Sequence, residues 1–161
     1  MRGKLISYIL EITAALFLLL SFYPLMRYGT LADIQVPQHY TKGCVDIWTG
    51  REMFIYLALI FTAIYALLWV SQLYPKIINN PFKSIMSAEA RASLGKSIAR
   101  LLKVWIMAHF AFLSISSYRI ALGKAQCLNN TIPCIIISCA IVHLALILIF
   151  QFSGQSSEHT S

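Results

Sequence analysis

Four long apolar runs dominate the chain, and polar segments of unequal length separate them. Each run has the roughly 20 mostly apolar residues that a transmembrane helix needs. Stretches such as residues 16–20 and 135–137 are continuously apolar, which is unlike the alternation typical of a membrane β-barrel strand. The pattern therefore predicts helices over residues 5–26, 53–74, 101–122 and 132–152. We expect them to pack as an all-α, integral membrane four-helix bundle, a single domain over residues 1–152.

Composition supports membrane insertion, and charge gives an orientation. Hydrophobic residues make up 58% of the chain and charged residues 12%, with a mean hydropathy of +0.70; soluble domains carry about 25% charged residues. Basic residues concentrate before the first helix and between the second and third helices. The positive-inside rule then places both termini in the cytoplasm, with residues 153–161 as a disordered cytoplasmic tail. Anionic lipid accounts for the net charge of +7, so no nucleic acid is expected.

The polar segment between the first two helices holds the candidate ligand-binding residues. Pro37 fixes φ, and Gly43 permits a tight turn, so residues 36–48 are expected to form a structured outer loop. Polar and aromatic side chains gather in it, and we take four as candidate contacts for a ligand: His39, Tyr40, Asp46 and Trp48. A loop folded only for its own stability is the alternative. The spacing of His39, Cys44 and Asp46 matches no standard zinc framework, so no metal site is expected.

Three ionisable side chains lie inside the predicted helices, where they are costly in lipid and mark candidate sites. They are Glu11, His109 and His143, and all three fall in the cytoplasmic half or the centre of the membrane. We expect Glu11 to face the interior and hydrogen-bond His109 or His143. Such a buried polar cluster either fixes helix packing or serves as a proton or ion site. Lys103 and Arg119 are expected to extend to opposite interfaces.

Three of the four cysteines fall on the outer side of this topology. Cys44 and Cys127 lie in outer loops and Cys134 at the rim of the fourth helix, so Cys127 can pair with either of the other two. Cys139 is expected to remain unpaired. The chain has no Cys-x-x-Cys pair, no Gly-rich phosphate loop and no nucleophile elbow; we therefore expect no enzyme and no cofactor.

The outer loop and the segment after it resemble a known family. A proline, a histidine followed by an aromatic residue, a glycine, an acidic residue, an aromatic and a basic residue recur in order at Pro37, His39, Tyr40, Gly43, Asp46, Trp48 and Arg51. Residues 20–85 are in this respect similar to the N-terminal domain of unknown function of SdpI-type membrane proteins. That family includes bacterial immunity proteins against a secreted peptide toxin.

The resemblance implies a non-enzymatic, multi-pass protein of the bacterial inner membrane. It would sense or neutralise an extracellular peptide through its outer loops and meet a cytoplasmic regulator through the basic linker. The first alternative is a small ion-coupled transporter or transporter subunit that uses Glu11, His109 and His143. The second, which the cysteine spacing disfavours, is a thiol oxidoreductase.

Overall fold

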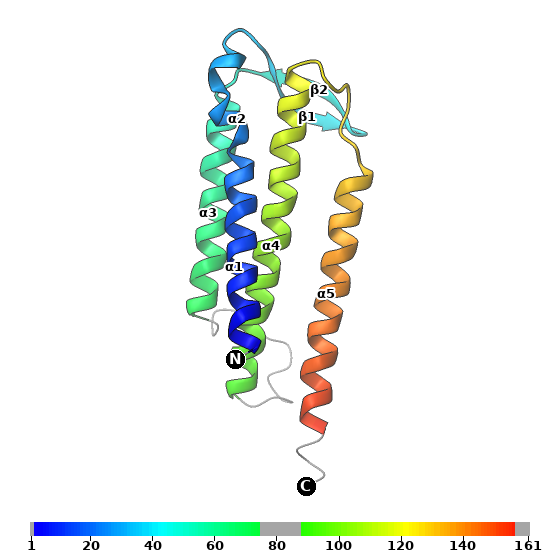
Figure 1. The fold of residues 1–161 in the computed structure, drawn as a ribbon. Helices are drawn as coiled ribbons and strands as arrows, with labels where there is room; N and C mark the ends of the chain where they lie inside the picture. The colour runs from blue at the N-terminus through cyan, green and yellow to red at the C-terminus, as the bar shows by residue number, and fades with distance from the viewer. Residues whose placement is uncertain (1, 75–87, 157–161) are drawn as a thin grey trace.

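Four long helices form the body of the molecule in this computed structural model, which describes residues 2–74 and 88–156 (Figure 1). Each is long and apolar enough to cross a membrane. They are α1 (Arg2–Ser21), α3 (Met53–Leu73), α4 (Ala88–Ala121) and α5 (Thr131–Ser156). The prediction of four helices that are long and apolar enough to span a membrane is thus confirmed for this part of the chain.

The four helices alternate in direction, and α4 lies at the centre of their packing. Helix α4 packs against α1, α3 and α5, while α5 stands apart from α1 and α3 in Figure 1. The start of α1 and the end of α5 lie at the end of the bundle opposite a small β-hairpin. We refer to these two ends as the hairpin end and the far end.

A two-stranded antiparallel sheet covers the hairpin end, which corrects the all-α prediction. Its strands are β1 (Val36–Thr41) and β2 (Cys44–Thr49). Lys42 and Gly43 connect them with φ of 52° and 86°, the backbone of a tight two-residue hairpin turn. The polar and aromatic residues that indicated a loop belong to strands here, because the first strand packs on α4 and the second strand pairs with the first.

Two helix boundaries also differ from those expected. Helix α4 begins at Ala88 rather than near residue 101, so its amphipathic beginning and its apolar span form one continuous helix. Helix α5 continues to Ser156, so residues 153–156, expected in a disordered tail, are helical. The rest of that tail and residues 75–87 of the linker lie outside the described residues.

A small hydrophobic core joins the hairpin to the bundle. Leu31, Val36, Phe54 and Tyr118 are buried together at the hairpin end. Two short helices, α2 (Tyr23–Met26) and the 3-10 helix η1 (Tyr28–Leu31), connect α1 to this core, and Leu31 belongs to the second of them. The rings of Tyr23 and Tyr118 meet edge to face at 5.5 Å. Burial of Val36 from the first strand therefore fixes one end of the hairpin to α3 and α4.

Candidate functional site

Three further connections hold the free end of the hairpin over the bundle. The Tyr40 hydroxyl lies 2.7 Å from the Ser117 hydroxyl of α4. A disulfide joins Cys44 to Cys127, in the segment between α4 and α5. Beside it, the backbone N–H of Leu128 donates to the Gly43 carbonyl at 2.7 Å. The hairpin is thus tied to two separate parts of the chain, so its outward face is held in a fixed position.

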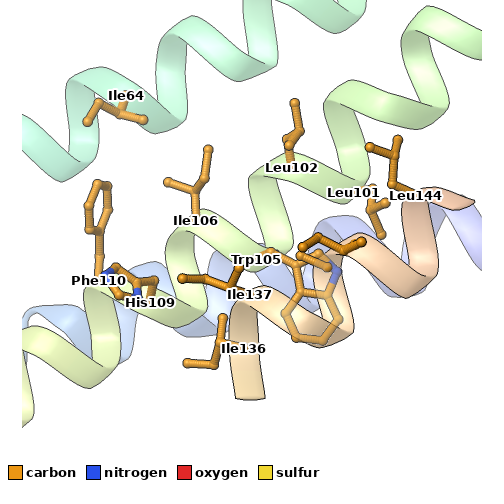
Figure 2. Close-up of a pocket in the computed structure, with 12 residues that line it drawn as sticks. Ile64, Leu101, Leu102, Trp105, Ile106, His109, Phe110, Ile136, Ile137 and Leu144 are labelled. Carbon is orange, nitrogen blue, oxygen red and sulfur yellow. The ribbon is translucent and has the colours of Figure 1, made fainter. Parts of the chain in front are cut away.

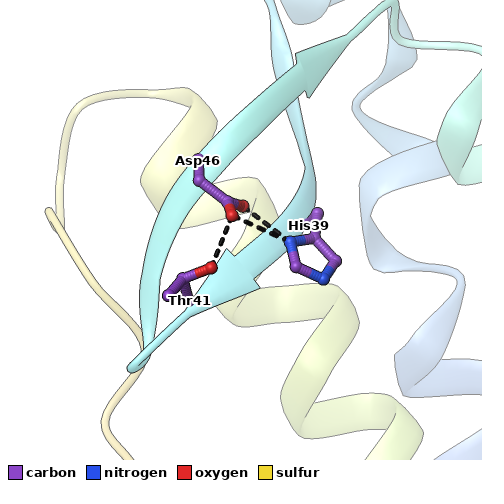
Figure 3. Close-up of polar contacts among 3 residues, drawn as sticks. All are labelled: His39, Thr41 and Asp46. Atoms are coloured by element: carbon purple, nitrogen blue, oxygen red, sulfur yellow. Dashed lines mark hydrogen bonds and ion pairs between the residues drawn. The ribbon is translucent and has the colours of Figure 1, made fainter.

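The outward face carries a polar triad of His39, Thr41 and Asp46 (Figure 3). His39 Nδ1 lies 2.8 Å and 3.0 Å from the two carboxylate oxygens of Asp46, and the Thr41 hydroxyl donates to the same carboxylate. The hydrogen bond from Thr41 and the neighbouring His39 lower the pKa of Asp46 below its usual value. The carboxylate consequently orients the imidazole and leaves Nε2 available to a ligand.

Two apolar side chains of the second strand are exposed at the hairpin end. Trp48 is 43% exposed and Ile47 is 50% exposed. Three of the four candidate contacts named from the sequence, His39, Asp46 and Trp48, are therefore accessible at the hairpin end. An exposed tryptophan beside a carboxylate and an imidazole offers both an apolar anchor and directional polar contacts.

Tyr40, the fourth candidate, faces the bundle. Its ring is half-buried and its hydroxyl bonds Ser117, because it neighbours His39 on the strand and successive side chains point to opposite faces. Burial raises the pKa of the Tyr40 hydroxyl above its usual value. Tyr40 is thus an anchor of the hairpin rather than a contact for a ligand.

The disulfide is one of the two pairings that the sequence left open. Cys44 and Cys127 are joined, whereas Cys134 and Cys139 are free thiols, both exposed on α5. The bond closes a sequence separation of 83 residues and links the beginning of β2 to the segment between α4 and α5. Cys134 is therefore no part of the bridge.

An ionic cluster lies toward the far end, where α1, α3 and α4 meet. The Glu11 carboxylate accepts a hydrogen bond from the Lys103 ammonium and lies 3.5 Å from Arg100 Nε. With its amide nitrogen turned to the carboxylate, Gln72 donates to Glu11 and accepts from Lys103, both at 2.7 Å. Lys103 is 0% exposed, and its ammonium lies 5.0 Å from the centroid of the Tyr65 ring.

This cluster corrects two expectations. Glu11 pairs with Lys103 and Arg100 rather than with His109 or His143, and Lys103 turns inward rather than extending to the interface. The reason is helical geometry: residues 103 and 109 are about 120° apart around α4, so a carboxylate facing Lys103 cannot also face His109. Lys103 is the buried partner, and its pairing with the Glu11 carboxylate avoids an uncompensated charge in the interior.

Both histidines lie instead on the α5 side of α4. His109 lines a cavity of about 500 Å³ between α3, α4 and α5 (Figure 2), and its Nδ1 is buried with no hydrogen-bond partner in the described residues. His143 of α5 packs on Trp105, with ring centroids 5.4 Å apart. The other side chains of the cavity wall are aliphatic or aromatic, with the Trp105 indole among them, so the cavity is a mostly apolar space between α3, α4 and α5.

One member of the ionic cluster, Gln72, was not singled out from the sequence. It is a polar side chain within the second apolar run. Arg100 lies one turn before Lys103 on α4, and the spacing places the two on one helix face. The sequences of α1 and α3 contain no pattern that indicates which helix supplies the partner of Lys103.

The outward face of the hairpin offers polar and apolar groups that can bind a ligand. Within residues 2–74 and 88–156, no three His, Cys, Asp or Glu side chains gather closely enough to hold a metal ion. Comparison with known proteins adds no assignment: no family model, no curated protein and no solved structure matches the chain.

Proposed function

We propose that the protein is a non-enzymatic, multi-pass protein of the bacterial inner membrane that binds an extracellular peptide through the outward face of its hairpin. This is the role that the resemblance to SdpI-type immunity proteins implies. The observation that carries the proposal is the anchoring of the hairpin by Tyr40–Ser117 and Cys44–Cys127. A surface held in place before binding loses little conformational freedom when a ligand arrives.

The chemistry of the outward face suits a peptide with both apolar and basic side chains. Trp48 lies two residues from Asp46 on the second strand and therefore on the same face. It is an exposed apolar contact, and tryptophan is over-represented among residues that dominate binding energy. The Asp46 carboxylate, ionised at neutral pH, attracts a lysine or arginine. His39, held by Asp46, offers its second ring nitrogen as a further polar contact.

The proposed orientation places the hairpin outside the cell and both termini in the cytoplasm. The distribution of basic residues supports it, and a disulfide at the hairpin end agrees with an oxidising compartment on that side. The beginning of α4, from Ala88 to about Arg100, would then face the cytoplasm, where a regulator could meet it.

The test is protection of bacteria from secreted peptides. A toxin-sensitive strain expressing the protein is challenged with a panel of purified amphipathic peptide toxins, and a potential-sensitive dye reports depolarisation. We expect protection against at least one peptide, lost in Trp48→Ala and reduced in Asp46→Asn. Trp69→Phe, at an exposed position of α3, is the matched control and should protect fully. Equal protection by all variants would show that Trp48 and Asp46 do not contact the peptide. Absence of protection by the wild type would exclude this role for the peptides tested.

A second candidate, ion-coupled transport, is favoured by the fully buried Lys103 beside Glu11. Intramembrane ionisable pairs of this kind often lie on ion or proton pathways. The residue set differs from the one expected from the sequence, since His109 and His143 lie elsewhere. Proton flux into liposomes that contain a pH-sensitive dye tests it: Glu11→Gln should abolish a flux that depends on the protein, and an unaltered flux would contradict it.

A further inference from the structure

The ionic cluster carries an excess of positive charge. Two cations, Lys103 and Arg100, face one carboxylate, that of Glu11. Lys103 is fully buried and bonds Glu11 directly, with Gln72 bridging the pair. Glu11 is therefore matched by Lys103, and the charge of Arg100 remains to be balanced.

No other carboxylate is placed to balance it among the described residues. The chain has six acidic residues, of which Asp33, Asp46 and Glu52 lie in the segment at the hairpin end. Glu89 lies about 16 Å from Arg100 along α4, and Glu158 is outside the described residues. Residues 75–87 contain no acidic residue at all, so the linker cannot supply the missing charge.

Arg100 is also placed to meet a ligand. Its side chain is 28% exposed, and its Nε lies 3.5 Å from Glu11. That nitrogen is buried and makes no hydrogen bond with the described residues. Measured along α4, Arg100 lies about 27 Å from Tyr118, which packs in the core at the hairpin end. With a hydrocarbon thickness of about 30 Å, this is the depth at which headgroups of the opposite leaflet begin.

We propose that Arg100, with the buried Lys103 behind it, binds an oxyanion of the phosphate class at the cytoplasmic boundary of the membrane. The guanidinium presents several donors in a planar fork that matches phosphate oxygens. The oxyanion is either the headgroup of an anionic phospholipid or free phosphate. This inference depends on neither function proposed above, because it concerns binding at the far end of the bundle.

The test measures binding in two arms with purified full-length protein. In the lipid arm, native mass spectrometry in a non-ionic detergent follows titration with phosphatidylglycerol, with phosphatidylcholine as the uncharged comparison. In the phosphate arm, tryptophan fluorescence follows thermal unfolding in phosphatidylcholine nanodiscs with sodium phosphate or sodium chloride at equal ionic strength. Saturable binding that is selective for phosphatidylglycerol in the first arm identifies a lipid headgroup as the ligand. A rise in the unfolding temperature with phosphate but not with chloride, in the second arm, identifies the free anion.

Three variants connect the binding to the cluster. Arg100→Gln should weaken binding at least about tenfold, since charged hydrogen bonds are lost. Lys96→Gln removes the same charge from an exposed position one turn earlier on α4 and should leave binding within about twofold. Glu11→Gln should strengthen binding, because it removes the competing carboxylate.

Two outcomes would overturn the proposal: wild-type affinity in Arg100→Gln, or an equal loss in Lys96→Gln, which would indicate unspecific attraction to a basic surface. Absence of selective binding in both arms would also overturn it. If Arg100→Gln fails to fold, Arg100→Lys is tested instead, because it retains the positive charge without the planar guanidinium. It should bind several-fold more weakly, and unchanged affinity would exclude a role for the guanidinium.

Discussion

Replacing Glu11 by alanine should destabilise the bundle strongly. The substitution removes the carboxylate that accepts from Lys103, yet Lys103 remains 0% exposed between α1, α3 and α4. Gln72 and the Tyr65 ring still contact the ammonium, but neither carries a compensating charge. The expected effect therefore comes from the cation left behind rather than from the glutamate that is lost.

The size of the effect follows from the burial of Lys103. Breaking a buried ion pair by removing one partner costs about 3–5 kcal/mol. Glu11→Gln should cost less, about 1–3 kcal/mol, because an amide still accepts a hydrogen bond. The double variant Glu11→Leu/Lys103→Met leaves no fully buried charge without a partner, and the remaining cation, Arg100, is 28% exposed. It should therefore recover most of the stability that Glu11→Ala loses.

The free energies of unfolding of these variants are measured in mixed micelles. The mole fraction of sodium dodecyl sulfate is increased, and tryptophan fluorescence follows reversible unfolding. Lys96→Met is the matched control, since Lys96 is exposed and surface substitutions change stability by about 0.5 kcal/mol or less. A double-mutant cycle then isolates the Glu11–Lys103 coupling. If the stability losses of the single Glu11 and Lys103 variants simply add in the double variant, the pair makes no buried interaction. The reasoning also fails if Glu11→Ala is as stable as Lys96→Met.

Three further predictions concern the hairpin end. Cysteine introduced at Thr41 should react with an impermeant thiol reagent added to intact cells, whereas cysteine at Lys96 should react only after permeabilisation; the reverse result would invert the proposed orientation. Cys127→Ser should remove the bridge to Cys44 and lower stability by about 2–4 kcal/mol, and an unchanged unfolding free energy together with a free Cys44 in the wild type would contradict the bond. Because the folded pKa of Asp46 is lowered, its contribution is present above the usual value of about 3.9 and is lost as the pH falls below that value. The protection of the hairpin amides against hydrogen exchange, relative to the unfolded chain at the same pH, should fall there, and Asp46→Asn should remove this acid dependence.

The sequence was sufficient for the membrane helices because hydrophobic burial in lipid needs only length and apolarity. It was less informative at their ends. The amphipathic beginning of α4 and its apolar span are one helix from Ala88 to Ala121, since no proline or glycine turn interrupts them. Hydropathy indicates which residues of a helix lie in lipid. It does not indicate where the helix begins when the helix continues beyond its apolar span.

The hairpin and the ionic cluster depended on packing that a single sequence does not reveal. Residues 36–49 carry β-branched and aromatic residues around Lys42–Gly43, which is a hairpin signal, but Pro37 and the polar residues favoured a loop. Val36 and Tyr40 turn toward the bundle only because α3 and α4 offer Phe54, Tyr118 and Ser117 beneath them. Similarly, Glu11 could be identified as buried from its position, but its partner depends on which face of α4 packs against α1.

Helix α4 connects the two sites, and its contacts limit how one could influence the other. The Tyr40–Ser117 bond joins it to the hairpin, and the Glu11–Lys103 pair joins it to α1 about 21 Å further along. Between them the buried Ser114 hydroxyl donates to the Ser21 carbonyl at 2.6 Å, which resists sliding of α4 along α1. Under the proposed function, binding of a peptide by the hairpin requires no change at the cluster, whereas sliding of α4 along α1 would disturb the Ser114–Ser21 bond. Capture is the simpler use of this structure, because rigid anchoring favours binding and opposes transmission.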